Sequence, residues 1–577
     1  MQYHVFATDF DGTLSHDGIV SEETIDALKR LADSGRKIVL VTGREMHSLK
    51  STFPTLNYFH WIVAENGGVI FDTSSGNEIV LGDAPPKSFV DELVKRGVNG
   101  ISVGQCVVAT WTPYENIVLD TIRDLGLELN VVFNKGAVMV LPPEINKATG
   151  LQRVLMELGL SVHNTVGVGD AENDHAFLKV CEFSAATANA LPSLKASVDL
   201  VLKKDHGAGV VELIDLVLED DLWSCKTPKK EGLAIGVSEN GPVLLPTYGD
   251  LMMICGASGG GKSTLANKIA DVLTENVYQF CLVDPEGDFE SLPGAIVLGG
   301  PNSAPQLGEI MHALEQPRSN VVVCLTGVSI PDRPEFFLRL LGGINQLRAR
   351  SGRPHWLILD EAHHLMPVDW EPPAELLPAG WSNVIAITVS PDLLPLTVLN
   401  RVSIVTIVGA DANETLKAFG AATNKTVPVL PTPDLTAGEV WQWDLVSILP
   451  IRFKALKSTR EHTRHRRKYA EGQLAPEKSF YFTGPEGKLN LRAQNLILFC
   501  QIVEGIDDET WFYHLQRNDF AHWFRDCIND DKLADVAELA AMNSDLNSVA
   551  TKTQIQDAIH RNYILLSSSK ISVPGAM

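Results

Sequence analysis

A short apolar run that ends in two acids constrains the fold of this chain more than any other feature. Residues 5–7 read VFA, and residues 9–13 read DFDGT. An apolar run with a charged tip is typical of a buried parallel strand, and doubly wound sheets bind their ligands outside the carboxyl ends of such strands. Asp9 and Asp11 lie one residue apart, so one can act on an atom while the other handles its proton. Gly12 allows the sharp turn that follows. We therefore predict a doubly wound, Rossmann-like α/β domain with a catalytic site at this strand end.

The DFDGT segment resembles motif I of the haloacid-dehalogenase superfamily, phosphohydrolases that use an aspartate nucleophile. The other three motifs of that family can be sought independently, and a candidate for each follows in order. They are a strand at 38–41 that ends in Thr42, Gly43 and Arg44 (motif II), Lys147 before a helical pattern at 151–158 (motif III), and Asp170 with Asp174 after an apolar strand (motif IV). Four matches in strand-then-loop context support the resemblance.

The resemblance implies a catalytic role for four residues. Asp9 would attack phosphorus and form an aspartyl-phosphate. Asp11 would protonate the departing oxygen and then activate the water that hydrolyses the intermediate. Thr42 and Lys147 would hold the oxygens of the transferring group as their charge develops.

The resemblance also implies a magnesium site. Mg²⁺ would be held by Asp9, by Asp170 and by the backbone carbonyl of Asp11, with Asp174 in support. Oxygen ligands suit a hard cation of this kind. Mg²⁺ is therefore the expected cofactor of the first domain, which we place at residues 1–222.

A substrate-binding cap is expected between motifs II and III. Residues 86–144 read helix, strand, strand, helix, strand, strand, at the place where the Cof-like branch of the superfamily carries an α/β cap. A strand at 61–64 runs into ENGG at 65–68, which resembles a loop of the same branch. The candidate substrate contacts are Gly43, Arg44 and Asn66, although Arg44 could equally pair with an acid. We expect a small phosphorylated metabolite, such as a sugar phosphate, as the substrate.

A glycine-rich segment in the middle of the chain predicts a nucleotide site. A strand pattern at 251–255 is followed by GASGGGKST at 256–264 and by a helical pattern at 265–273. This fits G-x-x-x-x-G-K-[ST], in which backbone N–H groups converge on phosphates, Lys262 reaches the outer phosphates and Ser263 ligates Mg²⁺. The candidate ATP-binding residues are Gly256, Ser258, Gly259, Gly260, Gly261, Lys262, Ser263 and Thr264.

A second acidic strand end supports ATP hydrolysis. The apolar strand 356–359 closes on Asp360 and Glu361. We predict that Asp360 ligates the metal and that Glu361 acts on the attacking water, an arrangement that suits hydrolysis. An intervening strand at 321–325 suits the ATPases that insert a strand between the two motifs. A later strand at 385–389 presents Thr388 and Ser390, which are either γ-phosphate sensors or ordinary strand-end hydroxyls.

The segment VDPEGDF at 283–289 resembles HerA/FtsK-like ATPases, as do the stretches 388–409 and 439–454. The resemblance implies a P-loop ATPase domain at 230–457. It also implies a ring-shaped homo-oligomer in which an arginine from one subunit completes the neighbour's site. Arg401 and Arg348 are candidates for that arginine, although an ordinary surface role is favoured for each.

The last part of the chain predicts a small, mostly α domain at 478–566. Residues 480–523 are rich in aromatic side chains and residues 533–559 have helical periodicity. This region resembles a domain of unknown function, and His514, Asp519 and His522 are predicted to be packing or surface residues. The basic run at 460–468 is read as a solvated linker, with a nucleic-acid contact or an arm onto a neighbouring subunit as alternatives. Residues 222–231 are a predicted linker, and the residues from 567 onward are predicted to be disordered.

Composition limits the classes of function. A chain of 577 residues with 45% hydrophobic and 21% charged residues is ordinary for a soluble protein of several domains. Its net charge of −23 argues against a protein coated for nucleic-acid binding, although a local basic groove is compatible with it. The eight cysteines show no metal spacing and are read as reduced thiols. Every apolar run is shorter than the roughly 18 residues of a membrane span, so we expect a cytoplasmic protein without a membrane partner.

The sequence leaves three hypotheses. The leading one is a Mg²⁺-dependent phosphatase fused to an ATP-binding and ATP-hydrolysing module. The second is a nucleic-acid-processing protein, either a DNA translocase-like ATPase or a polynucleotide kinase-phosphatase. The acidic net charge argues against both versions, and the metabolite-type cap and the Asp360–Glu361 pair argue against the kinase-phosphatase version. The third is a scaffold with one silent site, which nothing in the motifs supports.

Overall fold

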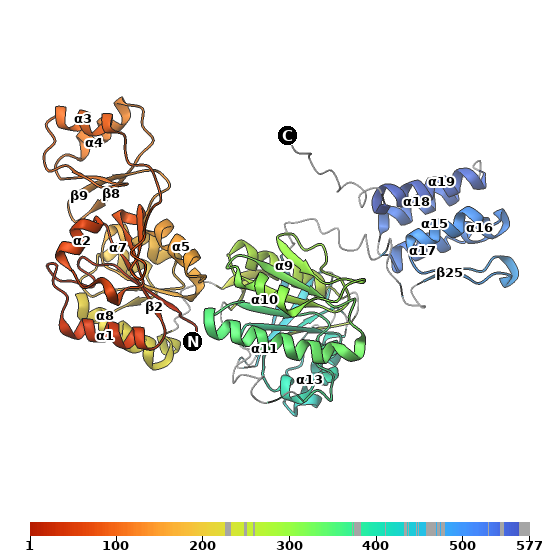
Figure 1. The fold of residues 1–577 in the computed structure, drawn as a ribbon. Coiled ribbons are helices and arrows are strands. Elements are labelled where there is room, and N and C mark those ends of the chain that lie inside the picture. The colour runs from red at the N-terminus through yellow and green to blue at the C-terminus, as the bar shows by residue number, and fades with distance from the viewer. Residues whose placement is uncertain are drawn as a thin grey trace. The chain divides into compact units, whose positions relative to one another are not determined.

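The chain divides into two compact units in the computed structural model, residues 1–285 with 294–457 and residues 286–293 with 458–577. Figure 1 shows the course of the chain. The finer boundaries expected at 222, 230, 457 and 478 remain predictions. The structure describes residues 1–225, 232–246, 251–257, 260–371, 373, 382–409, 411–431, 435–436, 438–445, 447, 449–456, 469, 474, 479–528, 530–542 and 547–564.

The first sheet has eight strands in the order β12-β11-β10-β1-β2-β3-β4-β5. Its strands are β1 (Val5–Thr8), β2 (Lys37–Val41), β3 (Trp61–Ala64), β4 (Val69–Asp72), β5 (Glu78–Val80), β10 (Thr165–Gly169), β11 (Phe183–Ala186) and β12 (Leu200–Val201). The strands from β12 to β3 are parallel, and β4 and β5 are antiparallel additions. All four residues of β1 are buried. The predicted doubly wound sheet is confirmed, with the acidic strand β1 at its centre.

Helices cover both faces of this sheet (Figure 1). One face packs against α1 (Glu22–Asp33), α2 (Met46–Thr52) and α8 (His206–Asp220), and the other against α5 (Lys147–Glu157), α6 (His175–Val180) and α7 (Pro192–Ser197). Helix α1 begins after Ser21, whose side chain accepts the N–H of Thr24 at 3.2 Å and caps the helix. The strand ends are thus fixed by a core on each side.

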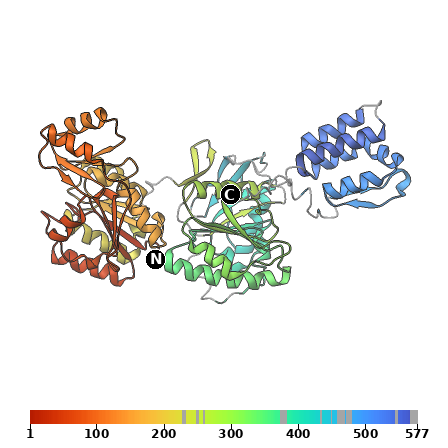
Figure 2. The same ribbon diagram turned by 45° about the horizontal axis from the view of Figure 1, so that its top comes forward.

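The cap forms a separate four-stranded sheet in the order β6-β7-β9-β8. Its elements are α3 (Lys87–Lys95), β6 (Ser102–Val103), β7 (Val108–Trp111), α4 (Glu115–Asp124), β8 (Asn130–Asn134) and β9 (Ala137–Leu141), in the order predicted from the sequence. Helices α3 and α4 cover one face of this sheet (Figure 2). Strands β8 and β9 are joined by the two-residue turn Lys135–Gly136, whose φ angles of 48° and 88° are those of a tight hairpin.

The second sheet has eleven strands in the order β14-β13-β23-β22-β21-β15-β20-β19-β16-β18-β17. They are β13 (Leu233–Ser238), β14 (Gly241–Leu245), β15 (Leu251–Cys255), β16 (Phe280–Asp284), β17 (Ala295–Leu298), β18 (Asn320–Cys324), β19 (Trp356–Leu359), β20 (Val384–Thr388), β21 (Val402–Val408), β22 (Glu439–Asp444) and β23 (Ile451–Ala455). The strands from β21 to β17 are parallel, and the other four are antiparallel. Strands β13 and β14 form one antiparallel hairpin, and β22 and β23 form another.

The strand between the two nucleotide motifs is not the one that the sequence suggested. Strand β20 lies between β15 and β19, whereas β18 lies beyond β16. Both strands are short buried apolar runs, so their composition does not distinguish them; only the pairing in the sheet does. Strand β20, which ends at Thr388, therefore lies between the strands that carry the two nucleotide motifs.

Helices also cover both faces of the second sheet (Figure 1). Helix α9 (Lys262–Glu275) lies on one face, where residues from 265 to 273 are almost all buried. The other face packs against α10 (Leu307–Glu315), α11 (Arg333–Ser351), α12 (Leu396–Leu399) and α13 (Ala412–Thr423). The fold is therefore a large mixed α/β sheet between two helical layers.

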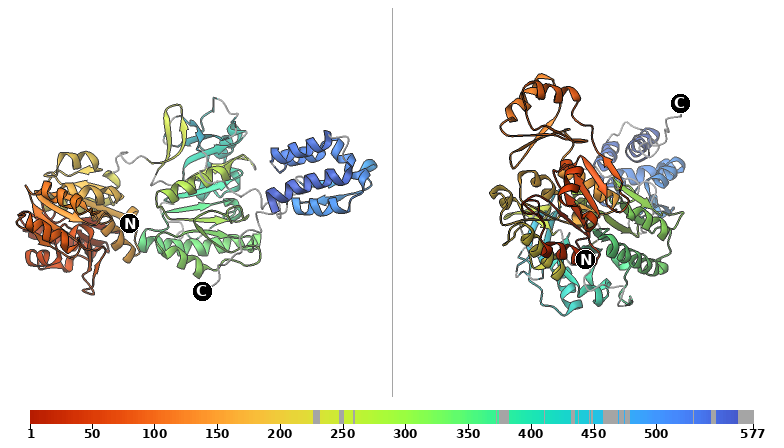
Figure 3. Two further views of the ribbon diagram at one scale, coloured as in Figure 1. Left: turned by 90° about the horizontal axis from the view of Figure 1, so that it is seen from above. Right: turned by 60° about the vertical axis from the view of Figure 1, so that its left-hand side comes forward.

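The second unit is mostly helical, as predicted, and its helices pack side by side (Figure 3). It contains α15 (Leu496–Gly505), α16 (Asp508–Gln516), α17 (Asp519–Asp526), α18 (Asp531–Met542), α19 (Ser548–Ile559) and a ribbon of β24 (Phe480–Phe482) with β25 (Leu491–Ala493). The ribbon was not predicted. The ring nitrogens of buried His514 bond the backbone N–H of Thr483 at 3.0 Å and face Asp519 at 2.8 Å, which makes this histidine a packing residue.

Several predictions lie outside the described residues: Ser258 and Gly259 of the glycine-rich segment, most of the linker at 222–231, the basic run at 460–468 and the tail from 567. All eight cysteines are thiols outside any disulfide bond, and six of them are buried. Among the described helices, none combines the length and the apolar character that crossing a membrane requires.

Candidate functional site

Three of the predicted motifs meet at one edge of the first sheet. Strand β1 lies between β2 and β10, and Thr8 is paired with Leu40 and with Val168. The residues that follow these strands, Asp9, Thr42 and Asp170, therefore leave the sheet side by side. Each of the three is at most 4% exposed. The register of the sheet thus brings motifs I, II and IV together, as the sequence predicted.

Lys147 lies between two carboxylates. It is the first residue of α5 rather than a residue before the helix, because the Asn146 side chain caps the helix there. Its Nζ lies 2.6 Å from Oδ1 of Asp9 and 2.6 Å from Oδ1 of Asp174. Burial lowers the pKa of Lys147, but these two carboxylates outweigh burial and raise it. The lysine therefore remains charged at a helix N-terminus that would otherwise disfavour a cation.

The acidic cluster concentrates negative charge in a buried place. Asp9, Asp170 and Asp174 offer oxygen atoms that lie within 4.8 Å of one another. Burial raises the pKa of Asp9 to about 8; Asp174 adds to this rise and Lys147 opposes it. Burial also raises the pKa of Asp170. Carboxylates this close resist simultaneous ionisation unless a cation joins them.

A divalent cation fits this cluster. Oδ2 of Asp174 accepts the N–H groups of Asp170 at 2.8 Å and Ala171 at 2.9 Å, so Asp174 shapes the loop and supports Asp170. The ammonium of Lys135 already lies 2.8 Å from Asp170 Oδ2 and 2.6 Å from the carbonyl oxygen of Asp11. The Lys135 ammonium thus lies against two of the groups expected to bind Mg²⁺. The donors are all oxygen atoms, which suits Mg²⁺.

Arg44 pairs with Asp11. Its Nε and Nη2 each lie 2.7 Å from one oxygen of the Asp11 carboxylate. The hydrogen bond to Asp11 raises the pKa of Arg44. Of the two roles that the sequence left open, the structure therefore shows the acid partner. Each carboxylate oxygen can accept more than one hydrogen bond, so the pairing with Arg44 leaves acceptor positions on Asp11 open.

The predicted substrate contacts Gly43 and Asn66 lie together beneath the cap. Nδ2 of Asn66 lies 3.0 Å from the sulfur of Met139 on β9, and its Oδ1 accepts from Asn173 at 2.9 Å. A Cβ atom at Gly43 would lie 3.3 Å from Asn66 Oδ1 and 3.5 Å from Met139 Sδ. These residues form the contact between the cap and the floor of the site.

Lys135 is a site residue that the sequence analysis missed. It reaches the acidic cluster from the tip of the β8–β9 hairpin, next to Gly12. A Cβ atom at Gly12, whose φ is 85°, would lie 2.1 Å from Lys135 Nζ and 2.6 Å from Asp170 Oδ2. The signal was the Asn-Lys-Gly turn between two apolar runs at 130–141, which is a hairpin pattern with a cation at its tip.

Glu65 is a second missed residue. Its side chain is buried, and its carboxylate accepts the N–H groups of Gln105 at 3.1 Å, Cys106 at 2.8 Å and Val107 at 3.2 Å. These three N–H groups belong to the turn between β6 and β7 of the cap. Glu65 therefore fastens the cap to the first domain, which no local pattern in the sequence reveals.

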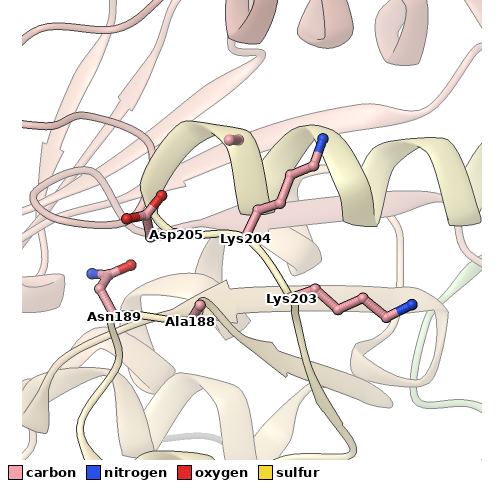
Figure 4. A pocket seen from close by; sticks show the side chains of 6 residues that line it. Ala188, Asn189, Lys203, Lys204 and Asp205 are labelled. Carbon is pink, nitrogen blue, oxygen red and sulfur yellow. The ribbon is translucent and has the colours of Figure 1, made fainter.

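A hollow of about 350 Å³ opens beside the cluster. It is lined by Ala188, Asn189, Lys203, Lys204, Asp205 and Ala208. Asn189 donates to the Gly12 carbonyl at 2.8 Å, which ties this wall to the strand end. The two lysines extend away from Asn189 (Figure 4), so they do not converge on a ligand.

The second sheet brings the predicted nucleotide residues Lys262 and Glu361 together. Lys262 begins α9, and its Nζ donates to the carbonyl of Gly256 at 2.9 Å and lies 4.0 Å from Glu361 Oε1. Asp360 is 2% exposed at the end of β19. Thr388 Oγ1 lies 3.3 Å from His363 Nδ1, and burial lowers the pKa of His363 to about 4, so that its ring is neutral.

Position 256 has no room for a side chain. A Cβ atom there would lie 2.0 Å from the carbonyl oxygen of Val408 at the end of β21. Gly260 and Gly261 lie just before α9, Ser263 and Thr264 lie in its first turn, and Thr264 is exposed. The described part of the loop therefore follows the strand–loop–helix course that the sequence predicted.

Arg348 does not fit the role of an arginine supplied to a neighbouring subunit. Its guanidinium donates to the carbonyls of Pro354 at 2.9 Å and Ser382 at 3.2 Å within its own domain. Arg401 follows α12 and is partly buried. The role expected of Arg401 remains a prediction.

Comparison with known proteins places the first domain. A family model described as haloacid dehalogenase-like hydrolase matches residues 6–99 and 113–214. The phosphoglycolate phosphatase of Methanothermobacter thermautotrophicus is 29% identical over 213 residues, which cover 36% of this chain and 96% of that protein. The phosphoglycolate phosphatase of Sulfurisphaera tokodaii is 30% identical over 226 residues, which cover 37% of this chain and 93% of that protein. A crystal structure of a haloacid dehalogenase-like hydrolase from Bacteroides thetaiotaomicron is 18% identical and covers 37% of this chain and 99% of that one, with a TM-score of 0.33.

The matched residues contain the acidic cluster, Lys147 and the cap hairpin that carries Lys135. The relatives are covered almost from end to end, so the similarity extends over a whole domain and not over one motif. Through this domain, the chain belongs to the family of haloacid dehalogenase-like hydrolases.

Proposed function

We propose that the first domain is a Mg²⁺-dependent phosphatase that hydrolyses a small phosphomonoester through an aspartyl-phosphate on Asp9. The observation that carries this proposal is the buried cluster in which Lys147 lies 2.6 Å from Asp9, with Asp170 beside it. A carboxylate nucleophile must be shielded from an anionic substrate. The charged lysine supplies part of that shielding, and Mg²⁺, held by Asp9, Asp170 and the carbonyl of Asp11, would neutralise the phosphoryl oxygens when bound.

The residues then divide the reaction between them. As the bond between Asp9 and phosphorus forms, the bond to the leaving oxygen breaks, and Asp11 gives that oxygen a proton. Thr42 and Lys147 hold the phosphoryl oxygens while their charge develops. Asp11 next accepts a proton from water, which attacks the aspartyl-phosphate. Inorganic phosphate leaves and Asp9 is restored.

We propose a small phosphorylated metabolite as the substrate. Relatives that are 29% and 30% identical over this domain are phosphoglycolate phosphatases, which supports a phosphorylated hydroxy acid. A sugar phosphate, the class expected from the sequence, is the alternative. The cap of about sixty residues covers the side of the site where the leaving group would lie.

Phosphate release from a panel of phosphomonoesters tests this function. With Mg²⁺, the full chain is expected to release phosphate from 2-phosphoglycolate or from a sugar phosphate, and Asp9→Asn is expected to abolish the release. Asp26→Asn is the matched control, since Asp26 is an exposed carboxylate paired only with Lys29. A chain that hydrolyses no member of the panel, or an Asp9→Asn variant with full activity, would contradict the proposal.

The second sheet supports a second activity, ATP binding and hydrolysis. Strands β15, β20 and β19 are neighbours, and Lys262 lies 4.0 Å from Glu361 at their carboxyl ends. We propose that ATP binds at the loop before α9, that Ser263 and Asp360 hold its Mg²⁺, and that Glu361 acts on the attacking water. A homo-oligomeric ring built on this domain belongs to the same proposal.

Binding of a fluorescent ATP analogue tests it. Lys262→Ala should lose binding and ATP turnover, whereas Lys417→Ala, at an exposed position on α13, should keep both. Equal binding by the two variants would contradict an ATP site. ATP turnover that DNA stimulates, and that salt suppresses steeply, would instead favour the nucleic-acid hypothesis.

A further inference from the structure

Lys135 occupies the position of a cation in the acidic cluster. Its Nζ lies 2.8 Å from Asp170 Oδ2 and 2.6 Å from the Asp11 carbonyl oxygen, and its side chain is 45% exposed. These are two of the three groups that we propose as Mg²⁺ ligands. Two cations at about 4 Å or less repel each other, so the ammonium and Mg²⁺ cannot share these oxygen atoms. Binding of Mg²⁺ must therefore displace Lys135.

The hairpin that carries Lys135 stays in place when the side chain moves. The turn has only two residues, and its closing pair, Asn134 and Ala137, belongs to the ladder between β8 and β9. Met139 on β9 contacts Asn66 of the first domain at 3.0 Å. Displacement therefore happens by rotation of the four-carbon stem, and the ammonium remains above the site.

Three of the other four cations of the cap are paired with carboxylates elsewhere, and the fourth, Lys87, is exposed at the start of α3. Lys95 and Arg96 pair with Glu92, at 3.1 Å and 3.0 Å. Arg123 pairs with Asp120 at 2.6 Å. Among the cap residues that the structure describes, Lys135 is the cation that reaches the acidic cluster. It is therefore the positive charge that the cap offers to a substrate.

The chemistry of the leaving group completes the argument. In an in-line displacement, the leaving oxygen lies opposite the attacking atom, which is Asp9 here. The cap covers that side. A carboxylate one carbon away from the leaving oxygen would fall within reach of a lysine that the metal has displaced, and a charge-assisted hydrogen bond would form.

We propose that Lys135 is the specificity-determining residue for a carboxylate on the leaving group. Before the metal binds, Lys135 neutralises the acidic cluster. When Mg²⁺ enters, it releases Lys135 to bind the substrate carboxylate. The inference rests on the proposed phosphatase function, and it narrows the substrate class to phosphorylated hydroxy acids.

Metal titration tests the first half without any turnover. Calorimetric titration of the substrate-free full chain with Mg²⁺ is expected to give a Kd about tenfold lower for Lys135→Met than for the wild type, because no ammonium competes. Lys95→Met is the matched control, because Lys95 is a cap lysine that pairs with Glu92 and is more exposed than Lys135. The Kd of this variant for Mg²⁺ should equal that of the wild type. An unchanged Kd in Lys135→Met would overturn the displacement.

Substrate discrimination tests the second half. At saturating Mg²⁺, Lys135→Met should lower kcat/KM for 2-phosphoglycolate about 50-fold, chiefly through KM, because a hydrogen bond to a charged group is lost. It should leave kcat/KM for p-nitrophenyl phosphate, which has no carboxylate, within about twofold. Lys135→Arg, which keeps the charge, should restore most of the activity on 2-phosphoglycolate.

The outcomes separate this inference from the function on which it rests. If the wild type hydrolyses both substrates and Lys135→Met affects them equally, the inference fails and the phosphatase stands. A wild type that prefers glucose 6-phosphate to 2-phosphoglycolate also overturns the inference. If the wild type hydrolyses no phosphomonoester, the proposed function fails, and the metal titration alone decides whether Lys135 is displaced.

Discussion

The two candidate sites of the first unit contain the same kinds of residue, but their lysines have different hydrogen-bond partners. Each has a lysine at the start of a helix, Lys147 on α5 and Lys262 on α9, and each has acids at strand ends, after β1 and β10 in the first site and after β19 in the second. The ammonium of Lys147 already lies 2.6 Å from the proposed nucleophile. The ammonium of Lys262 lies instead 2.9 Å from a carbonyl of its own loop, at Gly256. The first site has its lysine and acids already in contact, whereas Lys262 in the second would have to exchange hydrogen-bond partners to bind the proposed nucleotide.

The difference follows from what holds each lysine. A buried ammonium between two carboxylates compensates charges that would otherwise be uncompensated, and removing one partner of such a group commonly costs about 3–5 kcal/mol. An ammonium on a backbone carbonyl contributes an ordinary charge-assisted hydrogen bond, roughly 1.5–3 kcal/mol. Lys147 thus compensates buried charge in the folded core, whereas Lys262, although also buried, is held by the weaker kind of contact.

The largest expected effect is that of Asp9→Asn. Because the amide cannot form the aspartyl-phosphate, phosphatase turnover should fall by at least about 10⁴-fold, as expected when a nucleophile is removed. ATP binding should be unchanged, since the two sites use separate residues. Phosphate release and analogue binding measured on one preparation check both statements. Loss of ATP binding in this variant would mean that the two sites are not independent.

Lys147→Met and Lys262→Met test the contrast itself. Lys147→Met should lower phosphatase turnover by about 10²–10³-fold and lower the free energy of unfolding by about 3 kcal/mol, because Asp9 and Asp174 lose their counter-charge. Lys262→Met should abolish ATP binding while lowering the unfolding free energy by less than about 2 kcal/mol. Urea unfolding of the metal-free chain measures the stabilities, with Lys417→Met as the surface control. Equal destabilisation by the two variants would remove the distinction between the sites.

The pH dependence of ligand binding should also differ between the sites. Burial raises the pKa of Asp9 to about 8, so near neutral pH protons compete with Mg²⁺ for the carboxylate that Lys147 contacts. Mg²⁺ affinity should therefore rise up to about tenfold per pH unit from pH 6 to about 8 and then level off. Because the pKa of Asp9 is raised in the folded state, the contribution of Asp9 to the free energy of unfolding of the metal-free domain is lost as the pH rises through about 8. Burial lowers the pKa of His363 to about 4, so its ring stays neutral between pH 6 and 8. His363 should therefore give the affinity for ATP no pH dependence in this range. Titrations at pH 6, 7, 8 and 8.5 distinguish a rising from a flat Mg²⁺ profile, and a flat one contradicts the prediction.

The smallest expected effect concerns the cap, which only the first site possesses. In Glu65→Gln, the new NH₂ group cannot accept the N–H groups that the carboxylate holds at residues 105–107. The cap should be less firmly fixed, and kcat/KM of the phosphatase should fall about fivefold, whereas ATP hydrolysis should not change. Steady-state kinetics of both reactions measure this. A loss in the ATPase alone would contradict the assignment of Glu65 to the cap.

The strand ends of both sheets could be predicted because their cause is local. An apolar run such as residues 5–7 or 356–359 can satisfy its burial only as an inner strand, and the acids after it must then lie at the sheet edge. The start of α5 was missed by a few residues, although Asn146 followed by Thr149 is a capping pattern that could have shown it.

The remaining features depend on contacts between distant segments. Strands β18 and β20 are alike in composition, so the sequence could not show which one lies beside β15. Lys135 is 124 residues away from Asp11, and Glu65 about forty residues away from the turn that it holds. The sequence predicted a mostly helical domain here and missed the ribbon of β24 and β25. The residues against which Phe480 and Phe482 pack come later in the chain, so no local pattern marks the strand. The roles of the individual site residues remain predictions.

The cap sheet meets the first domain through two of its turns, and the two attachments differ in strength. The β6–β7 turn gives three N–H groups to the buried carboxylate of Glu65, and breaking them would strand a charge without solvent. The β8–β9 turn is attached through Lys135, whose half-exposed ammonium water can solvate. The attachment through Glu65 is therefore the stronger of the two, and the attachment through Lys135 is the one that a competing cation such as Mg²⁺ would release while Glu65 keeps its hold on the cap.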